Sequence, residues 1–307
     1  MSKEENWARF YELVGRDNPL KSLNQMVPHL LKCSSQPLDT GASEKILKIV
    51  NSPAVGLPYP IQDVSYAAAV LGKRKIRDIA VGTAIYTHCQ NKEKMGFQIW
   101  KHSFCCGRTA EILAETGSQM QSAAFAAGLL HDLGKILLYS NNPSAFQTLI
   151  EHWKDQKGKL RCWEVEKKLF GITHTEIGAM AGILWNLPKP ICHGILDHHT
   201  PKNKSIQNEG EYLSLILHLS DFICWTLNRP SVTGPNPFIL RKPENSISHP
   251  LLTTAGINPK IFPEIVEEIK KELLKTETTL EWIKMSLQHE NIPDESVPES
   301  ENNVGMG

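Results

Sequence analysis

Seven residues of the types that bind divalent metals recur from residue 102 onward, at positions that fall on helices or at helix ends. They are His102, His131, Asp132, His174, His198, His199 and Asp221. Neutral imidazoles and carboxylates are ligands suited to Zn, Fe, Mn or Ni, and an aspartate between two ions can bridge them. No thiolate is positioned among them, which favours a catalytic type of centre with open water positions over a structural zinc site. For any one of these residues alone, a hydrogen-bonded place in the core is the more frequent role.

Helices must position these side chains, because helical periodicity dominates the chain and clear β alternation is scarce. Apolar residues recur at spacings of three and four in residues 42–50, 64–83, 97–114, 123–139, 176–185, 212–227 and 262–285. The sequence THTE at 173–176 has the form of a capping box and predicts a helix start at His174. His131 and Asp132 are adjacent, so on a helix they point about 100° apart and serve different edges of one site. We therefore expect an all-α fold.

Composition limits the classes of partner. The 307 residues hold 41% hydrophobic and 21% charged residues, a normal globular mixture, and 33 basic residues balance 33 acidic ones. No excess positive charge draws the chain to nucleic acid or to an anionic membrane, so neither is expected as a partner. No apolar run approaches the roughly 20 residues of a membrane span, and the first residues do not resemble a signal peptide. We expect a cytoplasmic protein whose seven cysteines, without any C-x-x-C pair, are reduced and buried, Cys105 and Cys106 as small core residues.

The order H, HD, H, HH, D resembles the HD superfamily of metal-dependent phosphohydrolases, and HDLGK at 131–135 is similar to one of its most specific signatures. The surrounding sequence more closely resembles the HDOD branch, the HD-related output domain of bacterial signalling proteins. Residues 46–80 are similar to the N-terminal block of that branch. The segments WKHS, AAGLLHDLGK, HTEIGAMAGILWNLPKPICHGILDHH and LHLSD then follow in family order. The resemblance covers about residues 15–230.

The resemblance implies an HD-type helical bundle with an N-terminal helical lobe. We expect the HDOD lobe at 1–92, the bundle with the metal site at 93–230, and a C-terminal connection and helix at 231–288. The polar, acidic residues 289–307 are expected to form a disordered tail. Four residues match the core ligands of the superfamily: His102, His131, Asp132 and Asp221. Three further residues match ligands of a second ion in the related HD-GYP phosphodiesterases: His174, His198 and His199. The implied cofactor is a divalent metal, as a binuclear Fe or Mn centre, with Zn, Ni or Mg as alternatives.

Two departures bear on activity. The GYP substrate motif is missing after His199, and Gln98 stands where HD-GYP enzymes carry a glutamate ligand. The first hypothesis is therefore a signal-transduction module that holds metal and acts through protein partners. The alternative is a metal-dependent phosphohydrolase acting on a nucleotide or other phosphoester, and a third hypothesis is a metal that only stabilises the fold.

Two further residues are candidates for supporting roles. In an active enzyme Lys135, one turn beyond Asp132, is a candidate phosphate contact, and the alternative is an ordinary solvated lysine. His218, three residues before Asp221, is a candidate supporting residue.

Overall fold

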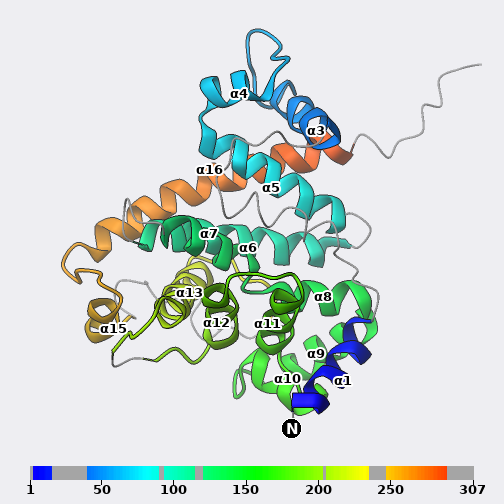
Figure 1. Cartoon of the computed structure of the whole chain (residues 1–307), viewed down its shortest axis with the longest axis vertical. Helices are drawn as coiled ribbons and strands as arrows, with labels where there is room; N and C mark the ends of the chain where they lie inside the picture. The colour runs from blue at the N-terminus through cyan, green and yellow to red at the C-terminus, as the bar shows by residue number, and fades with distance from the viewer. Residues whose placement is uncertain are drawn as a thin grey trace, which may run out of the picture.

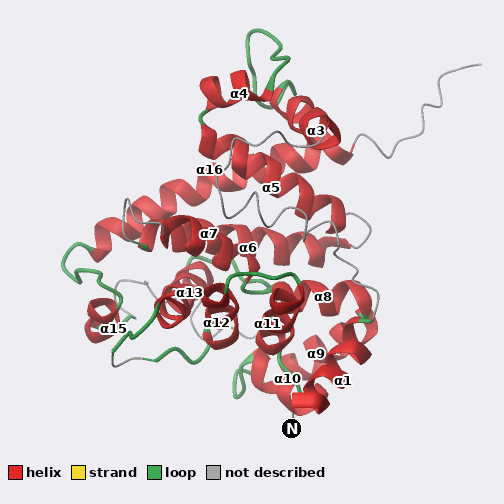
Figure 2. Cartoon of the chain, in the orientation of Figure 1, coloured by secondary structure: helices red, strands yellow, loops and turns green. Residues whose placement is uncertain are grey.

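The computed structural model describes residues 3–15, 40–89, 93–114, 120–202, 205–234 and 247–288. Helices form nearly all of the regular structure in these ranges, and no strand occurs in them (Figure 2). The helices are α1 (Lys3–Val14), α3 (Thr40–Val50), α4 (Val64–Leu71), α5 (Lys73–Cys89), α6 (Glu93–Leu113), α7 (Met120–Leu130), α8 (Leu133–Asn141), α9 (Pro143–Asp155), α10 (Cys162–Phe170), α11 (His174–Leu184), α12 (Lys189–Asp197), α13 (Glu209–Thr226), α15 (His249–Thr254) and α16 (Phe262–Gln288). The prediction of an all-α fold is confirmed. The predicted tail at 289–307 lies outside the described residues.

The helices form a bundle with a small lobe at one end (Figure 1). Within the bundle α6 packs against α7, α13 and α16, and α11, α12 and α13 pack side by side. The lobe consists of α3 and α4, which pack against each other and against α5. The long helix α16 contacts α3, α5 and α6 and so joins lobe and bundle. Helix α1 lies against α8, at the end of the molecule opposite α4 (Figure 1). The boundary placed between residues 92 and 93 stays a prediction.

Buried ion pairs connect the helices where α5, α6 and α16 meet. Arg77 of α5 pairs with Glu111 of α6 at 2.9 Å, and Arg108 of α6, only 2% exposed, reaches Glu272 of α16 at 3.0 Å. Because removing one partner of a buried pair leaves an uncompensated charge, the first pair fixes α5 against α6 and the second fixes α16 against α6.

Close backbone approach explains the glycines near HDLGK. A Cβ built on Gly128 of α7 would lie 2.7 Å from the Cα of Gly107 in α6, so these two helices touch backbone to backbone. A Cβ on Gly134 would lie 2.0 Å from the carbonyl oxygen of His174. A side chain at either position is excluded unless the backbone moves. The small residues of this stretch thus bring α6, α7, α8 and the start of α11 within reach of one site.

The predicted capping box at the start of α11 is confirmed. Thr173 accepts a hydrogen bond from the backbone N–H of Glu176, whose carboxylate accepts one from the N–H of Thr173 at 2.8 Å. These bonds satisfy two N–H groups that would otherwise lack partners at the helix start. His174 is therefore fixed as the first residue of α11, as the sequence predicts.

In the described part of the chain, no helix combines the length and apolar character needed to cross a membrane.

Candidate metal centre

All seven residues predicted as metal ligands lie together at the centre of the bundle. Their positions are His102 in α6, His131 and Asp132 in the turn between α7 and α8, His174 at the start of α11, His198 and His199 directly after α12, and Asp221 in α13. Five of them are no more than 1% exposed: His102, His131, Asp132, His174 and His198. The side chains of His199 and Asp221, 18% and 14% exposed, form the edge of the cluster that faces solvent.

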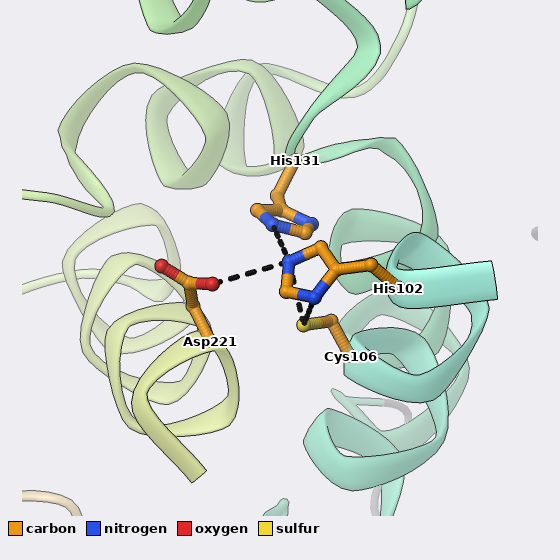
Figure 3. Close-up of side chains that lie close together, drawn as sticks. All are labelled: His102, Cys106, His131 and Asp221. Carbon is orange, nitrogen blue, oxygen red and sulfur yellow. Dashed lines mark hydrogen bonds and ion pairs between the residues drawn. The ribbon is translucent and has the colours of Figure 1, made fainter. Parts of the chain in front are cut away.

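One group of donor atoms surrounds His102 (Figure 3). Its Nε2 lies 3.3 Å from Nε2 of His131 and 3.1 Å from Oδ1 of Asp221. The sulfur of Cys106, one turn along α6, lies 3.4 Å from the same nitrogen. Any two donor atoms of this group are within 4.8 Å of each other, which is close enough to share one cation.

A second group consists of three imidazoles. His174, His198 and His199 each offer a ring nitrogen within 4.8 Å of the others, and Nε2 of His174 lies 3.2 Å from Nε2 of His199. The indole of Trp163 stacks on the His199 ring at a centroid distance of 6.1 Å. This group therefore offers a second position for a cation beside the first.

Asp132 lies between the two groups. Its Oδ2 is 3.7 Å from Nε2 of His102, while its Oδ1 is 3.6 Å from Nε2 of His131 and 3.3 Å from Nε2 of His174. Because this carboxylate lies within 3.7 Å of ring nitrogens of both groups, it can bind a cation in either group or bridge the two.

The hydrogen bonds of the outer ring nitrogens test whether a cation fits. Nδ1 of His102 lies 2.6 Å from the carbonyl oxygen of Arg229, and Nδ1 of His131 lies 2.7 Å from that of Gly128. Since a carbonyl only accepts, both Nδ1 atoms carry the proton, and the neutral rings point Nε2 lone pairs at each other. Nδ1 of His198 is held in the same way by the carbonyl of Ile195.

Two buried atoms in the cluster accept no hydrogen bond within the described chain. They are Nε2 of His198 and Oδ1 of Asp132, the latter in an ion pair with Nζ of Lys135 at 2.8 Å. A buried acceptor without any partner, as Nε2 of His198 is, is costly in a core, and a bound cation removes that cost. The residues present therefore fit a bound divalent metal.

Burial sets the charge of the histidines. It lowers the pKa of His131, and it brings the pKa of His198 and His199 well below the ordinary value, so these rings are neutral and able to bind metal. Burial acts in the same direction on His102, but the hydrogen bond and charge of Asp221 outweigh it and raise the pKa of His102. A cation competes with a proton for Nε2 of His102, so we expect metal affinity to fall as the pH falls.

Lys135 does not lie free in the site. It is 5% exposed, its Nζ lies 2.8 Å from both oxygens of Asp132, and it donates a further hydrogen bond to Ser231 at 3.0 Å. Burial alone would raise the pKa of Asp132, but the ammonium of Lys135 and the neighbouring histidines hold it well below its usual range. The alternative of a solvated lysine is wrong, and the phosphate contact stays a prediction that requires Lys135 to leave this ion pair.

Two residues discussed from the sequence have defined roles. The amide of Gln98 donates to the carbonyl of Pro230 and accepts from Thr233, both at 3.2 Å, so its two ends are engaged by the chain that follows α13. Nδ1 of His218 lies 2.9 Å from the carbonyl oxygen of His198. His218 therefore supports the backbone of a candidate ligand, and not the Asp221 carboxylate with which it shares a helix.

Glu166 of α10 is a supporting residue that the sequence analysis missed. Its Oε2 lies 2.7 Å from Nδ1 of His174 and accepts the backbone N–H of His174 at the same distance. Burial acts to raise the pKa of Glu166, but His174 outweighs this and lowers it, so the side chain is a buried carboxylate. A carboxylate on the outer nitrogen of a ligand histidine fixes its orientation and increases its basicity.

Glu166→Gln is therefore expected to weaken metal binding by about 10–100-fold, because the charge behind His174 is lost while the shape is kept. Competition with a coloured chelator measures the change. Glu151→Gln, on the exposed surface of α9, is the control and is expected to leave affinity unaltered. Equal affinity in both variants would contradict a ligand role for His174.

The family model of the HDOD domain matches residues 37–201. Because this match covers more than half of the chain, the chain belongs to the HDOD family. The matched span contains six of the seven candidate ligands and ends before Asp221. It is narrower than the resemblance expected at about 15–230.

Solved structures of similar fold come from several bacteria. An HDOD domain protein of unknown function from Geobacter sulfurreducens is 20% identical, with a TM-score of 0.60 over 92% of both chains. A candidate signal transduction protein from Marinobacter aquaeolei VT8 is 16% identical, with a TM-score of 0.66 over 93% of this chain and 66% of its own. A candidate phosphohydrolase from Shewanella amazonensis SB2B is 18% identical, with a TM-score of 0.55 over 92% of this chain and 93% of its own. At these identities the likeness establishes the fold.

One similar curated protein is an uncharacterized protein of Treponema pallidum (strain Nichols), 28% identical over 163 residues. The aligned part is 52% of this chain and 31% of that protein, so the chain spans less than a third of the length of this relative.

Proposed function

We propose that this HDOD protein is a bacterial signal-transduction module that holds a divalent metal centre and acts through protein partners. The observation that carries the proposal is that the cluster of candidate ligands is almost completely buried. Five of its seven donor side chains are at most 1% exposed, and the buried ammonium of Lys135 is paired with Asp132. A centre closed in this way holds its metal and stabilises one arrangement of α6, α11 and α13, but it offers little room to a substrate.

Exposed apolar side chains on the lobe support an interaction with protein partners. Helix α4 contains no charged residue and buries only Ala67, while Tyr66 and Val70 are 61% and 49% exposed. Tyr59, in the chain leading to α4, is 80% exposed. Exposed apolar side chains that gather at one end of a molecule are typical of interaction surfaces. The metal centre lies in the bundle and the apolar residues in the lobe, and α5 and α16 connect the two.

The second candidate function is a metal-dependent phosphohydrolase. It is favoured by the position of Asp132 between the two donor groups and by the partial exposure of His199 and Asp221. Bound metal would supply a water of lowered pKa and offset the charge of a phosphoryl group. The residues of the chain would hold the metals, and Lys135 would have to release Asp132 in order to bind a phosphate oxygen.

A hydrolysis screen separates the two functions. Protein loaded with Mn, Fe or Zn is incubated with phosphomonoesters, phosphodiesters and cyclic dinucleotides, and phosphate and product release are measured. We expect no turnover above that of Asp132→Asn, because both proteins would lack an accessible reaction site. Hydrolysis by the wild type that Asp132→Asn abolishes would contradict the module and establish the enzyme.

A further inference from the structure

Cys106 has an environment unlike that of a core cysteine. It lies one turn after His102 on α6, is 1% exposed, and places its sulfur 3.4 Å from Nε2 and 3.9 Å from Nδ1 of His102. Figure 3 shows its sulfur beside the His102 ring, whose Nε2 also faces His131 and Asp221. The expectation that no thiol stands among the candidate ligands is therefore wrong, because the i, i+4 spacing on a helix brings Cys106 and His102 to the same face.

The distances fit a four-ligand site. Bonds of about 2.0–2.3 Å from zinc to nitrogen, oxygen and sulfur place tetrahedral ligand atoms about 3.3–3.7 Å apart. From Nε2 of His102 the other donors lie at 3.1 Å (Asp221), 3.3 Å (His131) and 3.4 Å (Cys106). All pairs of these four donors remain within 4.8 Å. The three distances from His102 are thus close to those that a tetrahedral ion requires, and the remaining pairs are near enough to share one ion.

A second observation indicates a cation at this place and not a hydrogen-bonded thiol alone. The outer nitrogens of His102 and His131 are both engaged by carbonyl oxygens, so two inward nitrogens face each other and the carboxylate of Asp221 within the same space. When both rings are neutral, their inward nitrogens are acceptors only and have no hydrogen to share. A cation satisfies the donors of all four residues at once.

We propose that Cys106 provides a thiolate ligand to a zinc ion held together with His102, His131 and Asp221. The proposal rests on the proposed function, since it assumes that the histidine cluster holds metal. The thiol proton is released to solvent as the sulfur–zinc bond forms. Sulfur, two imidazoles and a carboxylate fill the four positions of zinc, which makes this half of the centre a closed, structural site. Asp132, whose Oδ1 lies 3.3 Å from Nε2 of His174, then serves the other half of the centre and does not bridge to the zinc. The other half of the centre has only nitrogen and oxygen ligands, so it is expected to prefer different metals from the half that contains Cys106.

Cobalt substitution tests the ligand directly, because a thiolate bound to Co²⁺ gives an intense charge-transfer band in the near ultraviolet that imidazole and carboxylate ligands do not give. The full-length protein is stripped of metal, titrated with Co²⁺, and then competed with Zn²⁺. We expect the band in the wild type and in Cys105→Ser, the matched control, since Cys105 is equally buried on the same helix but is not part of the donor group. We expect Cys106→Ser to lose the band and to bind zinc at least about 100-fold more weakly.

The outcomes separate this proposal from the proposed function. Co²⁺ bound by the wild type without the sulfur band, or an unchanged band in Cys106→Ser, would overturn the cysteine ligand and leave the histidine centre standing. No Co²⁺ binding at all would overturn both. If Cys106→Ser does not fold, X-ray absorption of the zinc-loaded wild type decides instead: a sulfur neighbour at about 2.3 Å that persists in Cys105→Ser supports the proposal, and its absence overturns it.

Discussion

Lys135→Met is expected to destabilise the metal-free protein by about 3–5 kcal/mol, because it leaves the buried carboxylate of Asp132 without its main compensating charge. Asp132 is 0% exposed, and both of its oxygens lie 2.8 Å from Nζ of Lys135. Methionine keeps the volume and removes only the ammonium. Urea denaturation in the presence of a chelator measures the loss in the free energy of unfolding.

Two controls separate this charge effect from a packing effect. The double variant Asp132→Asn/Lys135→Met removes both charges and is expected to be markedly more stable than Lys135→Met alone. Saturating divalent metal should also reduce the loss in the single variant, because a bound cation then compensates Asp132. A loss below about 1 kcal/mol in the chelated protein would place Lys135 among ordinary surface lysines and contradict the ion pair.

Gly134→Ala is expected to destabilise the protein by about 3 kcal/mol, at the upper end of the usual range for overpacking. The new Cβ would lie 2.0 Å from the carbonyl oxygen and 2.7 Å from the carbonyl carbon of His174. Both atoms belong to the backbone, so no rotamer change relieves the overlap. Moving the start of α11 also moves His174, so metal affinity should fall together with the thermal midpoint.

Gly178→Ala is the comparison for this effect. Gly178 lies on the turn of α11 that faces Gly134. A Cβ there would come closest to a methyl group of Ile195, at 3.0 Å, and to the backbone nitrogen of Gly134, at 3.3 Å. The Ile195 side chain can move to relieve the closer contact. We expect a distinctly smaller loss of stability and full metal affinity. Equal effects of the two substitutions would show that the close approach of α8 and α11 does not position His174.

The pattern of ligand-type residues was sufficient to predict which side chains gather. His102 and Asp221 are 119 residues apart in sequence, yet their side chains meet at 3.1 Å, as the order of the HD superfamily implies. The helix start at His174 also followed from local chemistry, because a capping box depends on only four consecutive residues. Helical periodicity predicted the all-α fold for the same reason, since its signal is local.

Features that depend on packing between distant segments were not predictable. Glu166 supports His174 only because α10 lies beside α11, and nothing in its spacing indicates this. The carbonyl of Arg229 fixes the ring of His102 through a loop that follows α13. The burial of Lys135 depends on Asp132 and on Ser231, 96 residues away. The i, i+4 spacing of His102 and Cys106 was readable in the sequence, but buried cysteines are so common in cores that the spacing alone did not single one out.

Elemental analysis of the protein purified without chelator tests the metal centre most directly. The wild type is compared with His131→Ala, which removes a nitrogen donor from the group around His102. We expect one to two equivalents of divalent metal in the wild type, a clear loss of metal in His131→Ala, and a lower thermal midpoint of that variant. A wild-type protein that binds no Zn, Fe or Mn under any condition, together with unchanged stability of His131→Ala, would contradict the metal centre.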